Sequence, residues 1–224
     1  MAPNVMSRIH KDGGPAEQES GAHHAKPRAL LGVVVMFVLV VLGVAGSGTP
    51  TVTGRRVLMI GDSLTGISTA ELGRTLRANG WEPEIVAVAG TSIGKWVPKV
   101  AGDAAFARAD VAVVELGTNN CLVHCRSLGP EIDVIVRSLL DNGVQRIFWV
   151  NVQEDLPNPV NRRFVNDEIE RAIVRWPQVS MIDLDTTFAG HPEWHVPDGV
   201  HFNAAGQRVF ADLVARALQS AKAS

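Results

Sequence analysis

Residues 57–65 read Val57-Leu-Met-Ile-Gly-Asp-Ser-Leu-Thr65, an apolar run that ends in a polar turn. A short run of branched apolar residues predicts a buried strand, and Gly61-Asp62-Ser63 predicts a sharp turn that leads into a helix. Ser63 would then lie at the carboxyl end of a strand, where open α/β sheets bind ligands. On its own the tripeptide favours a serine that caps the helix, because Ser and Asp are common at that position. A catalytic serine would need a base, an acid and an oxyanion site elsewhere in the chain.

Beyond this stretch, apolar runs alternate with segments of helical spacing, which predicts a parallel sheet with helices on both faces. The apolar runs predict five strands, at residues 56–60, 85–89, 111–116, 146–152 and 179–184. The segments of helical spacing lie at residues 68–79, 130–141, 162–176 and 204–221. In the third of these helices the spacing points four side chains inward: Phe164, Ile169, Ile173 and Trp176.

The composition fits an ordinary globular protein with a single folded domain. The chain has 224 residues, of which 46% are hydrophobic and 20% are charged. Its formal net charge is -2, and it contains no run of Lys or Arg with interleaved aromatic residues. We therefore do not expect nucleic acid to be a partner.

The N-terminal part differs from the rest of the chain. Residues 1–28 carry scattered charge with almost no apolar periodicity and are expected to form a disordered tail. Residues 29–46 are uncharged and largely apolar, which predicts a transmembrane anchor, or a secretory signal cleaved near the small residues 44–46. Residues 47–54 have the composition of a flexible linker, and the folded domain is expected at 55–224. The protein would then lie in the cell membrane with its catalytic domain outside the cytoplasm, or be secreted after cleavage.

The two cysteines, Cys121 and Cys125, are four positions apart in a segment that is predicted to be a loop. A disulfide between them would suit an exported domain. Two small buried thiols are the alternative. Zinc is less favoured, because the spacing is not that of a zinc knuckle and only His124 lies nearby.

A second polar cluster, Pro-Asp-Gly-Val-His at residues 197–201, precedes the last predicted helix. Asp198 and His201 are separated by a glycine and one further residue, so both side chains can turn toward one point. His201 could then take the proton of Ser63 while Asp198 holds the imidazole in the required tautomer, as in a serine triad. Without Ser63 the pair would suit a turn aspartate and a helix-capping histidine.

Two other predicted strands are followed by groups that can stabilise an oxyanion. Gly90 has no side chain, so its backbone N–H can approach a reacting oxygen closely. Asn119 carries a neutral amide, which donates hydrogen bonds without taking up the proton, and the N–H of Ser63 would be a third donor. Lys95 and Trp96 follow Gly90 and could form a substrate wall, although a partly packed surface tryptophan is the commoner outcome.

Four blocks of sequence occur in the order found in one enzyme family: Gly61-Asp62-Ser63-Leu64, Gly90, Gly117-Thr118-Asn119, and Asp198 to His201. In these blocks the chain resembles the SGNH, or GDSL, hydrolase family, and the resemblance covers the chain from Arg55 on. It implies a flavodoxin-like three-layer α/β/α sandwich and esterase activity on an acyl ester. The implied roles are nucleophile for Ser63, oxyanion donors for Gly90 and Asn119, and acid and base for Asp198 and His201. Asn120 stands where many members have aspartate, which concerns the support of the loop.

These residues predict a serine esterase that hydrolyses short-chain or acetyl esters through an acyl-enzyme intermediate, without a metal or organic cofactor. An envelope O-acyltransferase that passes the acyl group to a glycan is one alternative, and a catalytically inactive glycan-binding domain is another. The expected partners are an acyl ester of a small molecule or glycan, and the membrane through the N-terminal segment.

Two other pairs of residues compete for roles near the site. Asp183 and Asp185 end the fifth predicted strand and could supply the acid, although a turn or cap suits them better. His191 and His195, together with His201, raise the alternative of a metal site, which Pro192 and Pro197 make less favoured because they place the first two histidines in a loop.

Overall fold

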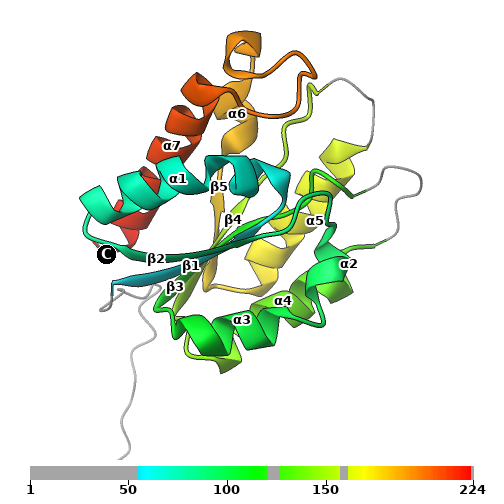
Figure 1. Cartoon of the computed structure of the whole chain (residues 1–224). Helices are drawn as coiled ribbons and strands as arrows, with labels where there is room; N and C mark the ends of the chain where they lie inside the picture. The colour runs from blue at the N-terminus through cyan, green and yellow to red at the C-terminus, as the bar shows by residue number, and fades with distance from the viewer. Residues whose placement is uncertain (1–54, 121–126, 157–160, 223–224) are drawn as a thin grey trace, which may run out of the picture. The chain divides into compact units, whose positions relative to one another are not determined.

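A sheet of five parallel strands forms the centre of the fold, with helices on both faces (Figure 1). The computed structural model describes residues 55–120, 127–156 and 161–222. The strands are β1 (Arg56–Gly61), β2 (Glu82–Ala87), β3 (Val111–Glu115), β4 (Arg146–Val150) and β5 (Val179–Ile182). Their order in the sheet is β2-β1-β3-β4-β5, which is the order of flavodoxin-like folds. The predicted α/β fold with a five-stranded parallel sheet is confirmed.

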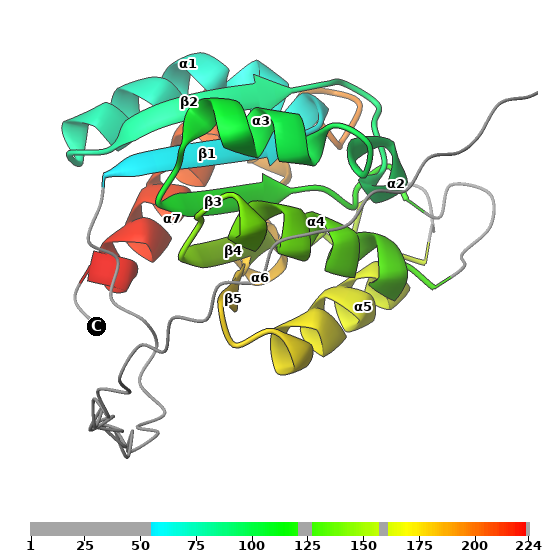
Figure 2. The same cartoon turned by 90° about the horizontal axis from the view of Figure 1, so that it is seen from below.

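Helices from the two ends of the domain cover one face of the sheet, and the helices between them in the chain cover the other. They are α1 (Ser63–Ala78), α2 (Ile93–Trp96), α3 (Val100–Ala107), α4 (Gly129–Asp141), α5 (Arg162–Arg175), α6 (Leu184–Phe188), the 3-10 helix η1 (Pro192–Trp194) and α7 (Ala204–Lys222). Figure 1 shows α1, α6 and α7 on one face, and Figure 2 shows α2 to α5 on the other. Successive side chains of a strand point to opposite faces, so each strand contributes to two cores. In β1, Val57 and Met59 pack on the α1 side, whereas Leu58 and Ile60 pack on the α2 side.

The predicted strands all occur, and the largest shift is at β2, which begins at Glu82 rather than at residue 85. In α5, Ile169 is buried, and Phe164 and Ile173 are partly buried against the same core, as is Trp176, which directly follows the helix. The short helices α2, α3 and α6 were not predicted, because so few turns give no clear helical periodicity.

Helix α1 begins at Ser63 rather than at the predicted residue 68. Asp62 is buried, and its Oδ1 accepts a hydrogen bond from the N–H of Leu64 at 3.0 Å. Asp62 is therefore the N-cap that satisfies one of the free donors of the first turn. Ser63 is the first residue of the helix, so the capping role that the tripeptide alone favoured belongs to its neighbour.

The carboxyl ends of β1 and β3 lie side by side where the strand order reverses. From β1 the chain crosses to β2 at one edge, whereas β3, β4 and β5 extend the sheet on the other side. Gly61 at the end of β1 pairs in register with Glu115 at the end of β3. Ligands of open α/β sheets bind at such a reversal point. Ser63 follows one of these strand ends and Asn119 follows the other.

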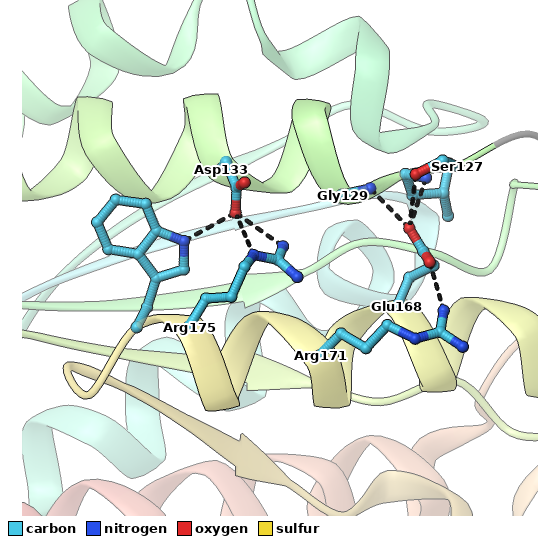
Figure 3. A network of polar contacts seen from close by, with 8 residues as sticks. Ser127, Gly129, Asp133, Glu168, Arg171 and Arg175 are labelled. Carbon is cyan, nitrogen blue, oxygen red and sulfur yellow. Dashed lines mark hydrogen bonds and ion pairs between the residues drawn. The ribbon is translucent and has the colours of Figure 1, made fainter.

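Two acidic side chains join α4 to α5 on the α2 side of the sheet (Figure 3). Glu168 Oε2 accepts hydrogen bonds from Ser127 Oγ at 3.1 Å, Leu128 N at 2.9 Å and Gly129 N at 2.7 Å. Asp133 Oδ1 accepts hydrogen bonds from Arg175 Nη2 and Trp176 Nε1, each at 2.8 Å. Because Ser127 to Gly129 lead into α4, Glu168 fixes the point at which this helix begins.

Several expected features fall on residues that the structure does not describe: the segments at 1–28 and 29–46, the linker at 47–54, and the pair Cys121 and Cys125. Within the described ranges, no helix combines the length and the apolar character that crossing a bilayer requires.

Candidate active site

Ser63, His201 and Asp198 form a continuous row of hydrogen-bonding groups. His201 Nε2 lies 2.9 Å from Ser63 Oγ, and His201 Nδ1 lies 2.7 Å from Asp198 Oδ2. Ser63 comes from the start of α1, and the other two residues come from the loop before α7. With the proton on Nδ1, Nε2 can accept a hydrogen bond from the serine hydroxyl. A serine triad needs this tautomer and this order of groups.

The loop that carries Asp198 and His201 turns at Gly199, whose φ of 71° favours glycine. Asp198 Oδ1 accepts hydrogen bonds from the N–H groups of Val200 and His201, so one oxygen closes the turn while the other faces the imidazole. The hydrogen bond with the His201 side chain, followed by the two backbone hydrogen bonds, lowers the pKa of Asp198 to about 2. Asp198 is therefore ionised at neutral pH and serves both as the turn aspartate and as the partner of the histidine.

Asn119 connects the turn at Ser63 to the loop that follows β2. Its Nδ2 donates to Asp62 Oδ2 at 2.7 Å and to the carbonyl oxygen of Thr91 at 3.3 Å. Thr91 directly follows Gly90, which has a φ of 71° and, among the described residues, no heavy atom within 4 Å of where a Cβ would lie. The segments that carry the three predicted oxyanion donors therefore meet at one edge of the sheet.

Gly117 and Asn120 shape the loop that follows β3. Gly117 has a φ of 144°, and a Cβ at this position would lie 2.6 Å from Val152 Cγ2. Asn120 is buried, and its Oδ1 accepts a hydrogen bond from the N–H of Ile93 at 3.0 Å. An aspartate would offer the same acceptor, so this contact agrees with the expected role of Asn120 in loop support.

Asp183 and Asp185 have hydrogen-bond partners other than the imidazole of His201. Asp183 is the N-cap of α6, and its Oδ1 accepts a hydrogen bond from the N–H of Thr186 at 3.0 Å. Asp185 Oδ1 accepts a hydrogen bond from the N–H of Glu154 at 2.7 Å. The capping role is confirmed for Asp183, whereas the hydrogen bond of Asp185 is to a residue 31 positions away in the chain.

His191 and His195 have separate partners. His191 Nδ1 lies 2.8 Å from Glu193 Oε1, and His195 Nε2 lies 3.0 Å from Gln153 Oε1. Over residues 55–120, 127–156 and 161–222, no group of three His, Cys, Asp or Glu side chains is placed to hold a metal ion.

Trp96 does not form a wall of the site, and it is not a surface residue. Its side chain is fully buried in the core on the α2 side, and its Nε1 donates to Thr91 Oγ1 at 2.9 Å. Lys95 remains exposed. The expectation for Trp96 was wrong because α2, which was not predicted, turns the indole inward.

Glu115 and Thr65 lie directly behind Ser63, although no role was predicted for either. Glu115 Oε2 accepts hydrogen bonds from the backbone N–H of Asp62 and from both the N–H and the hydroxyl of Thr65. A glutamate at the end of the apolar run 111–116 was the available signal. Its partners follow only from the register between β1 and β3.

A serine, an imidazole and a carboxylate in a row, beside amide donors at the carboxyl edge of a parallel sheet, form the arrangement of acyl-transferring serine hydrolases. The model of the GDSL-like Lipase/Acylhydrolase family matches residues 59–209. The chain belongs to this family, so the resemblance inferred from the four sequence blocks is confirmed.

Curated relatives of the chain include O-acetyltransferases. The O-acetyltransferase OatA of Staphylococcus aureus (strain NCTC 8325 / PS 47) is 29% identical over 109 residues, which are 48% of this chain and 16% of the relative. The putative peptidoglycan O-acetyltransferase YrhL of Bacillus subtilis (strain 168) is 25% identical over 172 residues, which are 76% of this chain and 25% of the relative. This chain thus spans a quarter or less of the length of these proteins.

The fold is also similar to that of a solved bacterial domain. The C-terminal catalytic domain of peptidoglycan O-acetyltransferase A (OatA) from Streptococcus pneumoniae, solved with a methylsulfonyl adduct, superposes with a TM-score of 0.61 at 21% identity. The match covers 75% of this chain and 95% of that domain. At this level of identity the likeness shows a shared fold.

Proposed function

We propose that the protein is a serine esterase that hydrolyses short-chain or acetyl esters through an acyl-enzyme intermediate. The observation that carries this proposal is the Ser63, His201 and Asp198 row, in which both contacts have hydrogen-bond distances of 2.9 Å and 2.7 Å. Membership in the GDSL-like family supports the acyl-transferring class.

In the proposed reaction His201 takes the proton of Ser63 while Ser63 Oγ attacks the ester carbonyl carbon. The bond to the alcohol oxygen then breaks, and the alcohol leaves with the proton from His201. Water, deprotonated by His201 in the same way, attacks the carbonyl carbon of the acyl-enzyme; the bond to Ser63 Oγ then breaks, Ser63 Oγ takes the proton back from His201, and the carboxylic acid is released. The ionised Asp198 stabilises the imidazolium that forms in both halves of the reaction.

The negative charge on the carbonyl oxygen is stabilised by the N–H groups of Ser63 and Gly90 and by the Asn119 amide. The short bond to Asp62 orients this amide, whereas its 3.3 Å contact with the Thr91 carbonyl is the one that the oxyanion replaces. The N-terminus of α1 adds partial positive charge at the same place. A donor of this kind typically lowers the barrier by about 3 kcal/mol.

Transfer of the acyl group to a glycan hydroxyl is the second candidate function. It is favoured by the relatives described as O-acetyltransferases, one of which is described as a peptidoglycan O-acetyltransferase. The same acyl-enzyme serves both reactions, because only the acceptor differs. With an acetyl ester and a peptidoglycan-derived sugar present together, a transferase yields acetylated sugar, whereas an esterase yields acetate alone.

For the location, we infer that the apolar segment at residues 29–46 places the domain outside the cytoplasm, either held at the membrane or released by cleavage. The length and uncharged character of this segment support the inference. A disulfide between Cys121 and Cys125 would suit that compartment.

Labelling with a fluorophosphonate tests the nucleophile. Ser63→Ala should abolish both the labelling and the hydrolysis of acetyl esters while the protein stays folded. Ser68→Ala is the matched control, since Ser68 is a buried serine of the same helix, and this variant should still be labelled. Labelling of the Ser63→Ala protein at another residue would overturn the assignment. A series of esters from acetyl to long-chain acyl groups then measures the preferred chain length.

A further inference from the structure

Glu115 is a buried acidic residue directly beneath the proposed nucleophile. It is the last residue of β3, where it pairs in register with Gly61 of β1, and 3% of its surface is exposed. A buried carboxyl group loses its hydration, so it has to be compensated by hydrogen bonds. Its partners therefore indicate what it holds in place.

All three donors to Glu115 Oε2 belong to the turn that presents Ser63. The N–H of Asp62 lies at 3.2 Å, the N–H of Thr65 at 3.1 Å and the hydroxyl of Thr65 at 2.9 Å. Asp62 and Thr65 stand on either side of Ser63 in the chain. A single oxygen thus fixes both ends of the segment that carries the nucleophile.

Gly61 gives this carboxyl group the room it needs. A Cβ at position 61 would lie 2.0 Å from Thr65 Oγ1 and 2.9 Å from Glu115 Oε2, both too close for real contacts. The glycine of the Gly-Asp-Ser block is therefore explained by the approach of Glu115 and Thr65.

The same contacts determine which backbone donor remains for the substrate. The first N–H groups of an α-helix have no acceptor within the helix. In α1, the N–H of Leu64 donates to Asp62 Oδ1, and the N–H of Thr65 donates to Glu115 Oε2. Within the described part of the chain, this leaves the N–H of Ser63 as the first-turn donor for an oxyanion. Asp62 extends the arrangement, because its Oδ2 accepts the hydrogen bond from Asn119.

We propose that Glu115 is a positioning residue, which holds the turn so that Ser63 Oγ stays within reach of His201 and the Ser63 N–H faces the oxyanion. This inference rests on the proposed function, in which Ser63 is the nucleophile. Glu115 acts through Asp62 and Thr65, and it does not touch the substrate.

The protonation of Glu115 suggests the substitutions that test this role. Burial, followed by the charge of Asp62, raises the pKa of Glu115 well above its ordinary value, which favours the uncharged form. Glutamine is the closest uncharged replacement, because its carbonyl oxygen can accept the same donors. Leucine has a similar size and accepts none of them.

The test compares the rate of fluorophosphonate reaction at Ser63 and the values of kcat and KM on an acetyl ester. Glu115→Leu should lower the labelling rate and kcat on the order of 100-fold, as expected for a misplaced reacting group, with little change in KM. Glu115→Gln should keep most of both. Thr65→Val should lower kcat by a smaller factor, and Thr65→Ser, which keeps the hydroxyl, should not.

Glu168→Leu is the matched control, because Glu168 Oε2 is a buried carboxylate oxygen that also accepts three donors, but between α4 and α5. It should lower Tm without lowering the labelling rate of the folded protein. If Glu115→Leu is labelled as fast as Glu168→Leu, the inference is wrong. If Glu115→Leu does not fold, a Thr65→Val protein with unchanged labelling rate and kcat overturns it. Absence of labelling in the unmodified protein would instead overturn the proposed function.

Discussion

Asp62 and Glu115 place two carboxyl groups in one buried site beneath Ser63. Burial raises the pKa of Asp62, although hydrogen bonds from Leu64, Glu115 and Asn119, and the charge of His201, oppose this effect. Burial and the neighbouring charge of Asp62 raise the pKa of Glu115 further. Because two adjacent carboxylates repel each other, the pair favours retaining a proton.

Glu115→Gln should flatten the dependence of stability on pH. A carboxyl group whose pKa is raised by folding contributes stability below its ordinary pKa of 4.5, and this contribution is lost as pH rises through the folded value. The free energy of unfolding of the unmodified protein, relative to that of the variant, should therefore fall as pH rises above 4.5, by at most about 1.4 kcal/mol per pH unit. Urea unfolding at a series of pH values measures this difference, and a constant difference would contradict the raised pKa.

The residues of the site differ in how far the sequence identifies them. Ser63, Asp198 and His201 could be proposed together because each lies in a short polar block with a specific chemical role. Glu115 could not, because a single glutamate at a strand end has no partner until the register of β1 and β3 is known. The location of Trp96 was predicted wrongly for a related reason, because the direction of its side chain depends on α2, a helix of four residues.

At the scale of elements, Glu168 joins the beginning of α4 to the middle of α5 (Figure 3). Burial raises its pKa, but hydrogen bonds from Gly129, Arg171, Leu128 and Ser127 outweigh burial, so the pKa lies below the ordinary value. The ionised carboxylate also faces the N-terminus of α4, where negative charge is favourable. The residues that Glu168 binds, Ser127 to Gly129, follow Asn119 in the chain by eight to ten positions.

Glu168→Ala should destabilise the protein by about 2 kcal/mol, because it leaves buried N–H groups without an acceptor. Glu170→Ala, on an exposed position of the same helix, is the control and should change stability by less than about 0.5 kcal/mol. Thermal and urea unfolding of both variants provide the measurement. Equal effects of the two substitutions would show that the contacts of Glu168 contribute little.

The elements that the sequence predicts are those with enough turns or enough consecutive apolar residues to show a period. The strands and the long helices α4, α5 and α7 meet this condition, and their bounds shift by a few residues at most. The start of α1 was missed because Ser63 to Ile67 contain glycine and polar residues, while the capping contact of Asp62 outweighs their low helix propensity.

At the scale of the whole molecule, a protein that lacks residues 1–54 should fold and retain its activity on a soluble acetyl ester. The core and the proposed site are built from residues that follow this segment. The full chain should partition into detergent or lipid vesicles, and the shortened protein should not. Phase separation in a non-ionic detergent, with Tm and kcat measured for both proteins, tests the expectation. A full chain that stays in the aqueous phase would refute the anchor, and a shortened protein that does not fold would refute the domain boundary.

The contacts of His201 span very different distances along the chain. Its bond to Asp198 joins residues three positions apart, whereas its bond to Ser63 joins residues 138 positions apart. During refolding, the local pair can therefore form as soon as one loop closes, but the long-range contact has to wait until the two ends of the domain have met. The reactivity of Ser63 is therefore expected to appear late in refolding, after the first and last helices of the domain have packed against each other. The rate at which this reactivity is regained would report on that last stage of folding.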